Sequence, residues 1–186
     1  MNIPGGSPPL VWQNGGSIFD QVGIVVSDLK AALTYFTDSL GIGPWRVYTH
    51  GPGLAKAVFQ GQPGDWLVWL ALSPWDTRPQ LELVQPISGD SVHHRFLAEH
   101  GEGVQHFGIV PADYDSACRR LVEQGFPCVQ EAAGYGDSRD GRNAYFDTRS
   151  RLFGSMLELM GPPTLRPKPL IEWASAERSA KNWPQP

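Results

Sequence analysis

Four polar side chains in this sequence stand inside two short apolar patterns, and each pattern occurs twice. The segment QVGIVV, which begins at Gln21, reappears as HFGIVP, which begins at His106. The segment LELVQP, which contains Glu82, reappears as LELMGP, which contains Glu158. The chain is therefore a duplicated module. If the two copies fold together about a pseudo-two-fold axis, the four polar side chains meet around that axis, and their oxygen and nitrogen atoms outline a metal site.

Each of these residues has a simpler explanation when it is taken alone. A Glu between two leucines usually lies on the solvated face of a half-buried strand, and a lone His in a strand is usually a core residue with satisfied hydrogen bonds. The repetition favours a ligand set, because the two copies differ at most positions that would be exposed but keep a polar residue here. A divalent cation would also neutralise two carboxylates that otherwise repel each other.

The ligand types limit the kind of metal site but not the identity of the metal. With no thiolate and only one imidazole among the four, we expect a roughly octahedral shell with one or two open positions for water or substrate oxygens. The expected cofactor is one divalent metal ion, and Zn, Ni, Co, Mn and Fe all stay possible.

Periodicity and turn residues indicate how the chain would position these side chains. A strand over residues 19–26 is followed by a helix that ends at Gly41, and then by strand segments near 45–49, 54–59 with 66–72, and 81–84. The second copy repeats this βαβββ order, with a strand over 104–110, a helix that ends at Gly125, and strands over 127–130, 143–147 and 153–160. Module one is thus 19–87 and module two 104–162. A connector over 88–103 has a short helix around Phe96.

The flanking segments and the composition limit the class of protein. Residues 1–18 are expected to form an N-terminal arm, and residues 163–186 a C-terminal tail that packs on the body or on a partner subunit. The net charge of −4, without a run of Lys or Arg, predicts no nucleic-acid or membrane partner. No signal peptide or membrane span is visible, so a cytoplasmic location is expected. Cys118 and Cys128 are expected to be free buried thiols.

These features resemble the vicinal oxygen chelate superfamily, which includes glyoxalase I, methylmalonyl-CoA epimerase, extradiol dioxygenases and bleomycin-binding proteins. The resemblance covers residues 19–162. It implies an α+β fold in which two tandem βαβββ modules form a cupped, barrel-like mixed sheet around a metal. It also implies metal ligands at the ends of the first and fourth strands of each module, and here those positions hold Gln21, Glu82, His106 and Glu158. This ligand set is similar to that of zinc-type glyoxalase I, whereas the segment FLAEHGEGVQH, from Phe96 to His106, is closer to methylmalonyl-CoA epimerases.

The expected chemistry is removal of the proton α to a carbonyl. A metal chelated by two adjacent substrate oxygens lowers the cost of this step, because it stabilises the enediolate. Glu158 is the first candidate for the base and Glu82 the second, which predicts an isomerase or epimerase, or a lyase if a leaving group is adjacent. A ring-cleaving dioxygenase is disfavoured, because its iron site needs two His and Gln21 stands in place of the first. An antibiotic-sequestering binding protein or a structural member of the fold is the alternative without catalysis.

The expected partners are a small-molecule substrate and a second copy of the chain in a homodimer. Aromatic residues suggest an apolar cleft for an aromatic, polyketide-like or long acyl substrate, with Trp45 and Tyr145 as substrate-binding candidates. Arg142, beside the loop 136–141, is the candidate for binding an anionic group. His50 and His93 are assigned no role, since they fall in predicted loop or connector segments.

Overall fold

The computed structural model describes residues 19–74, 76–174 and 183. Within these residues the chain forms one eleven-stranded mixed sheet and three α-helices. The strands are β1 (Gln21–Val25), β2 (Trp45–His50), β3 (Lys56–Phe59), β4 (Gln62–Pro63), β5 (Leu67–Leu72), β6 (Gln80–Ser88), β7 (Gly103–Ile109), β8 (Cys128–Tyr135), β9 (Gly141–Phe146), β10 (Met156–Gly161) and β11 (Ile171–Trp173). The helices are α1 (Leu29–Thr34), which continues as the π-helical turn η1 (Tyr35–Ser39), α2 (Val92–His100) and α3 (Tyr114–Glu123).

The order of the strands shows the duplication directly. One half of the sheet runs β2-β5-β6-β1 and the other runs β7-β10-β9-β8, so that β1 and β7 meet in the middle. These two strands are antiparallel, while β6 lies parallel to β1 and β10 lies parallel to β7. The predicted α+β fold of two βαβββ modules is therefore confirmed, and the junction between the modules is the β1–β7 pair.

Two short strands extend the sheet beyond the modules. The segments 54–59 and 66–72 were expected to belong together, but this prediction is wrong, because β3 leaves its own module and pairs antiparallel with β8 of module two. At the other end of the sheet β11 pairs antiparallel with β2. The sheet therefore ends in the short strands β11 and β4, and short edge strands leave little unpaired backbone for another chain to bind.

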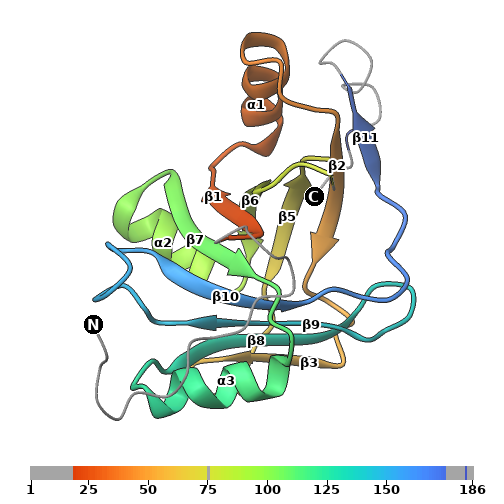
Figure 1. The fold of residues 1–186 in the computed structure, drawn as a ribbon. Coiled ribbons are helices and arrows are strands. Elements are labelled where there is room, and N and C mark those ends of the chain that lie inside the picture. The colour runs from red at the N-terminus through yellow and green to blue at the C-terminus, as the bar shows by residue number, and fades with distance from the viewer. Residues whose placement is uncertain (1–18, 75, 175–182, 184–186) are drawn as a thin grey trace.

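The alternation of side chains separates an outer face covered by helices from an inner face. Leu83 packs in a core cluster with Leu29 and Leu33 of α1, and Leu159 packs in another with Leu121 of α3. Figure 1 shows α1 outside one half of the sheet and α3 outside the other. Because neighbours in a strand point to opposite faces, the Glu beside each of these leucines points into the cup.

Aspartates at equivalent places begin the helix of each module. The Asp28 side chain accepts a hydrogen bond from the Ala31 N–H at 3.0 Å, and Asp113 accepts one from the Ser116 N–H at 3.0 Å. Such N-caps satisfy amides that have no partner within the helix. Along the described ranges, no helix is both long and apolar enough to cross a membrane.

The second and fourth strands of module two also differ from expectation in their bounds. The last strand was predicted to begin at residue 153, but β10 begins at Met156. Phe153 instead lies in a turn with φ of 51° and is fully exposed. β8 runs on to Tyr135, past the predicted end at residue 130. The predicted arm over 1–18 lies outside the described residues.

Candidate metal centre and cavity

Glycines at the module junction make room for the polar side chains. Gly23 of β1 stands opposite both Glu82 of β6 and His106 of β7. A Cβ atom on Gly23 would lie 1.9 Å from Cε1 of His106, so the imidazole ring lies directly against this backbone. Only glycine leaves that space, which explains why Gly23 stands two residues after Gln21 in this copy of the repeat.

The second copy has the same arrangement. Gly108 of β7 stands opposite both Gln21 of β1 and Glu158 of β10. A Cβ atom on Gly108 would lie 2.9 Å from Cβ of Gln21 and 2.8 Å from Cε of Met160. The repeated glycines therefore leave the space at the junction that the four repeated polar side chains occupy.

The structure brings the predicted ligands Glu82, His106 and Glu158 together. Nε2 of His106 lies 3.2 Å from Oε2 of Glu82 and 3.4 Å from Oε2 of Glu158, and one donor atom from each residue lies within 4.8 Å of the others. Adjacent ligands of a metal with bond lengths near 2.1 Å are about 3 Å apart. The spacing of these atoms therefore suits a shared divalent cation.

Unpartnered buried atoms provide a second test of the fit. Four donor atoms, one from each predicted ligand, are buried and have no hydrogen-bond partner within the described structure: Oε1 of Gln21, Oε2 of Glu82, Nε2 of His106 and Oε2 of Glu158. All four residues are at most 7% exposed. Buried polar atoms without partners are costly, and a metal ion would satisfy all four at once. The residues present fit a divalent metal.

A second set of side chains orients these donors, and the sequence pattern did not reveal it. Oε1 of Gln105 lies 2.5 Å from Nδ1 of His106, so this carbonyl oxygen accepts the Nδ1 proton and leaves Nε2 to face the carboxylates. Adjacent strand residues normally point to opposite faces, but the pairing of β1 with β7 passes from His106 to Val104 and skips Gln105. This β-bulge turns Gln105 toward the ring.

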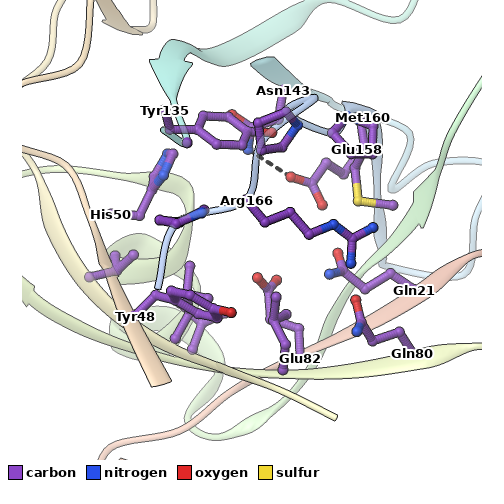
Figure 2. A pocket seen from close by; sticks show the side chains of 18 of the residues that line it. Gln21, Tyr48, His50, Gln80, Glu82, Tyr135, Asn143, Glu158, Met160 and Arg166 are labelled. Atoms are coloured by element: carbon purple, nitrogen blue, oxygen red, sulfur yellow. Dashed lines mark hydrogen bonds between the residues drawn. The ribbon is translucent and has the colours of Figure 1, made fainter. Parts of the chain in front are cut away.

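Glu158 is held by residues of the neighbouring strand β9. Nδ2 of Asn143 donates a 2.7 Å hydrogen bond to Oε1 of Glu158, and Tyr145, directly opposite Glu158, is also hydrogen-bonded to its carboxylate. Figure 2 shows Glu158 with its bond to Asn143 and Glu82 on the other side of the pocket. Asn143 thus fixes which oxygen of Glu158 faces His106.

The ionisation of the site follows from burial and charge. Burial raises the pKa of Glu82. Burial also acts to raise the pKa of Glu158, but the close approach of the His106 imidazole and the hydrogen bond from Asn143 outweigh it and lower that pKa. Burial acts to lower the pKa of His106, yet the two carboxylates raise it to about 9. Without a metal, a proton on His106 therefore offsets part of the negative charge, and a metal ion must displace it.

Gln21, Glu82 and Glu158 are among the residues that line a cavity of about 330 Å³. Its walls are partly apolar, with Val68, Leu70 and Val84 on one side. His50 and His93 also line the cavity; His93 is buried and His50 is half-buried. Burial lowers the pKa of His50 to about 4 and that of His93 well below its ordinary value, so both imidazoles are neutral at pH 7.

His93 and His50 are the cavity residues that the sequence left without a role. Neither ring nitrogen of His93 has a hydrogen-bond partner within the described structure, and neither does Nε2 of His50. They come from α2 and from the end of β2, and no spacing or repeat links them to the four donors. Such atoms are available to the polar groups of a ligand in the cavity.

Of the three predicted substrate-binding residues, Tyr145 is among those that line the cavity and the other two are not. The prediction for Trp45 is wrong, because its side chain is 0% exposed, packs under α1 and donates from Nε1 to the Ile42 carbonyl. Arg142 does not line this cavity either. Its guanidinium bonds to Asp115 at 2.8 Å and lies over the Tyr114 ring, which ties it to α3.

Comparisons with known proteins agree with this architecture. The sequence profile of the glyoxalase/bleomycin resistance protein/dioxygenase superfamily matches residues 20–146. The methylmalonyl-CoA epimerase of Mycobacterium tuberculosis is 28% identical, with a TM-score of 0.53 over 80% of this chain and 92% of that chain. The Streptomyces coelicolor methylmalonyl-CoA epimerase, solved with 2-nitronate-propionyl-CoA, is 22% identical, with a TM-score of 0.55 over 86% of this chain and 99% of that chain.

A methylmalonyl-CoA epimerase in complex with methylmalonyl-CoA and NH4+ is 21% identical, with a TM-score of 0.53 over 87% of this chain and 100% of that chain. At this identity the likeness is one of fold. A comparison with curated proteins gave no match. Two βαβββ modules, a donor cluster at their junction and a profile match over most of the chain lead to the same assignment: the protein belongs to the glyoxalase/bleomycin resistance protein/dioxygenase superfamily.

Proposed function

We propose that this protein is a divalent-metal-dependent enzyme that removes and returns the proton α to a carbonyl, in an epimerase or isomerase reaction on a small molecule. The observation that carries the proposal is the set of four buried, unpartnered donor atoms on Gln21, Glu82, His106 and Glu158. Gln21, Glu82 and Glu158 line a cavity, and its partly apolar walls suit an acyl or aromatic substrate. The likeness to the Mycobacterium tuberculosis methylmalonyl-CoA epimerase supports the same reaction class.

Two carboxylates from the two modules supply the proton transfer in this proposal. Glu82 and Glu158 approach Nε2 of His106 from strands on opposite sides of the junction. A substrate between them would present one face of its α carbon to each, so one carboxylate takes the proton and the other returns it on the opposite face. A metal held by the four donors would stabilise the negative charge that develops on the substrate oxygens.

The surrounding side chains keep this arrangement in place. Asn143 and Tyr145 hold Glu158, and Gln105 holds His106 in the tautomer that directs Nε2 at the carboxylates. Because the carboxylates are buried and line the cavity, a bound substrate competes with few water molecules for their protons. Pre-positioning of this kind is what a proton-transfer site needs.

The experiment is solvent deuterium exchange with methylmalonyl-CoA as the first substrate tested, followed by proton NMR. We expect the α proton to exchange with metal-loaded protein and not after removal of the metal with a chelator. Glu82→Gln should slow exchange by about 10²- to 10⁴-fold, the usual contribution of a positioned base. Glu99→Gln is the matched control, because Glu99 is an exposed residue of α2 outside the cavity.

Elemental analysis of protein purified without chelator decides between the candidate functions. About one equivalent of divalent metal per chain is expected. A protein that holds no metal, keeps its melting temperature when chelator is added and exchanges no α proton would instead be a small-molecule binding protein of the same fold.

A further inference from the structure

Two histidines outside the set of metal donors line the cavity with ring nitrogens that have no partners. His93 is 4% exposed, and both its Nδ1 and its Nε2 are buried without a hydrogen-bond partner within the described structure. His50 is half-buried, and the same holds for its Nε2. A buried polar atom without a partner is costly, so three of them on residues of one cavity indicate a partner that the chain itself does not supply.

The start of α2 directs His93 toward this cavity. Oε1 of Gln130, from β8, accepts a hydrogen bond from the Val92 N–H at 2.9 Å, which ties the beginning of the helix to module two. The next histidine along the chain, His94, points elsewhere, with its Nδ1 2.7 Å from the Gly89 carbonyl oxygen. Of the residues of α2, a helix that the structure describes in full, only His93 lines the cavity.

Both imidazole rings are fixed in orientation by tyrosine rings. His93 stands edge-on to Tyr145, with ring centroids 5.2 Å apart, and His50 stands edge-on to Tyr135, with centroids 5.1 Å apart. Figure 2 shows His50 beside Tyr135 on the wall of the pocket. The Tyr135 hydroxyl is bonded to a carbonyl of β9 at 2.9 Å, and Tyr145 is bonded to the carboxylate of Glu158. The hydroxyls of these tyrosines are therefore engaged, whereas the imidazole nitrogens are not.

The two histidines are also close enough to act together. The electrostatic effect of His50 is one of the causes that lower the pKa of His93, after the larger effects of burial and of His106. A neutral imidazole carries one N–H donor and one lone-pair acceptor. His93 thus offers a donor and an acceptor, and Nε2 of His50 offers one more of either kind, depending on its tautomer.

This set of groups limits the chemistry of a ligand. A hydroxyl group donates one hydrogen and accepts another, so it can use both kinds of site on the histidines. A carboxylate or phosphate group only accepts hydrogen bonds, and it would bring a negative charge into the cavity that Glu82 and Glu158 also line. The apolar side chains of Val68, Leu70 and Val84 suit a ring rather than a charged group.

We propose that His50 and His93 form a hydroxyl-binding subsite, which accepts an uncharged ring compound that carries a free hydroxyl group. A site built with buried hydrogen-bonding groups discriminates strongly against an analogue that lacks the matching group, because the groups then stay unpaired. The inference rests on the proposed function only for the identity of this cavity as the substrate site. It narrows the acyl or aromatic substrates of the proposed reaction to those with a hydroxyl group.

The test measures ligand binding by NMR, with protein in which the histidines are labelled with 15N. Phenol, anisole and toluene are titrated into metal-loaded protein and into protein treated with chelator. Phenol donates and accepts a hydrogen bond, anisole only accepts one, and toluene does neither. We expect phenol to bind at least about 10-fold more tightly than the other two in both preparations, and to shift the ring-nitrogen resonances of His50 and His93.

Substitution of each histidine separates the subsite from the metal centre. In His93→Phe and in His50→Phe the ring is kept and the nitrogens are removed, so the affinity for phenol should fall to within about 3-fold of that for toluene. His93→Gln, which keeps a donor and an acceptor, should retain part of the preference. All three variants should keep the wild-type metal content. His100→Phe is the matched control, because His100 is an exposed histidine of α2 outside this cavity, and it should keep the full preference.

Four results would overturn the inference. They are the absence of phenol binding, affinities for anisole or toluene within about 3-fold of that for phenol in the wild type, an unchanged preference in both His93→Phe and His50→Phe, and an equal loss in His100→Phe. The two proposals fail separately. Phenol binding that depends on the histidines, without any α-proton exchange, would leave this inference standing and refute the proposed reaction. Metal-dependent exchange without a preference for phenol would do the reverse.

Discussion

Replacement of Glu158 by Gln should weaken metal binding, although the amide keeps an oxygen that can coordinate. In the native site Oε1 of Glu158 accepts a hydrogen bond from Nδ2 of Asn143, and Oε2 faces His106. An amide has one oxygen and one NH2 group for these two places. If its oxygen faces Asn143, the NH2 group replaces a metal ligand. If its oxygen faces the metal, two NH2 groups meet in a buried site.

The cost follows from the second arrangement. Leaving a buried donor without an acceptor costs about 1–3 kcal/mol, and about 1.4 kcal/mol corresponds to a factor of 10 in affinity. The loss of one negative charge from the ligand set adds to this. We therefore expect Glu158→Gln to weaken metal affinity by at least about 10- to 100-fold, measured by competition with a chelating dye.

A second substitution reverses both effects together, because it supplies an acceptor for the amide NH2 group and restores the lost negative charge. In the double variant Glu158→Gln with Asn143→Asp, the new carboxylate accepts from the amide NH2 group, so the amide oxygen can turn to the metal. We expect this variant to recover at least 10-fold in metal affinity relative to Glu158→Gln alone. Metal affinity within about 3-fold of wild type in Glu158→Gln, or no recovery in the double variant, would refute the reasoning.

Three further predictions concern stability. Gly23→Ala should lower the unfolding free energy by about 1–3 kcal/mol and abolish metal binding, because its methyl group would overlap the His106 ring; a wild-type denaturation curve would contradict the close contact. In metal-free protein the folded pKa of His106 is about 9, above its ordinary 6.5, so the stability it contributes is complete below pH 6.5 and is lost as pH rises toward 9, by at most about 3 kcal/mol. Urea denaturation in the presence of chelator should show this decline, and metal-loaded protein should not; equal slopes would count against it. His93→Phe should raise the melting temperature, because an apolar ring replaces two unpartnered nitrogens in a buried position; a lower melting temperature would show that these nitrogens are satisfied.

The sequence predicted the parts of this fold that repeat or alternate. The duplicated segments located β1, β6, β7 and β10, and alternation within the LEL segments placed Glu82 and Glu158 opposite the helix-covered leucines. Both signals can be found in a single sequence, because alternation is a local pattern and duplication is a similarity between two parts of the same chain. The predicted donors Glu82, His106 and Glu158 were found together for this reason.

What the sequence did not reveal depends on long-range pairing. The alternation of β3 is the same whether its partner is β5 or β8, and the bulge that turns Gln105 toward His106 exists only in the pairing of β1 with β7. Trp45 follows a Gly-Pro turn, and such a position suits a cavity wall as well as a core. Only the packing of α1 places its side chain in the core. His93 carries no repeat partner, so nothing set it apart from other histidines.

The crossing of β3 to module two has a consequence for how the whole chain comes apart. If the two modules were joined only by β1 and β7, one could melt while the other stayed folded. A hairpin from the first half is instead hydrogen-bonded into the outer edge of the second, and β11 from the chain's end is bonded back onto the first. The half of the sheet formed by module two therefore includes β3, which belongs to module one in sequence. The half formed by module one includes β11, which follows module two in sequence. Separation along the junction must break these distant pairings too, which favours unfolding as one cooperative unit and makes neither half a domain that survives alone.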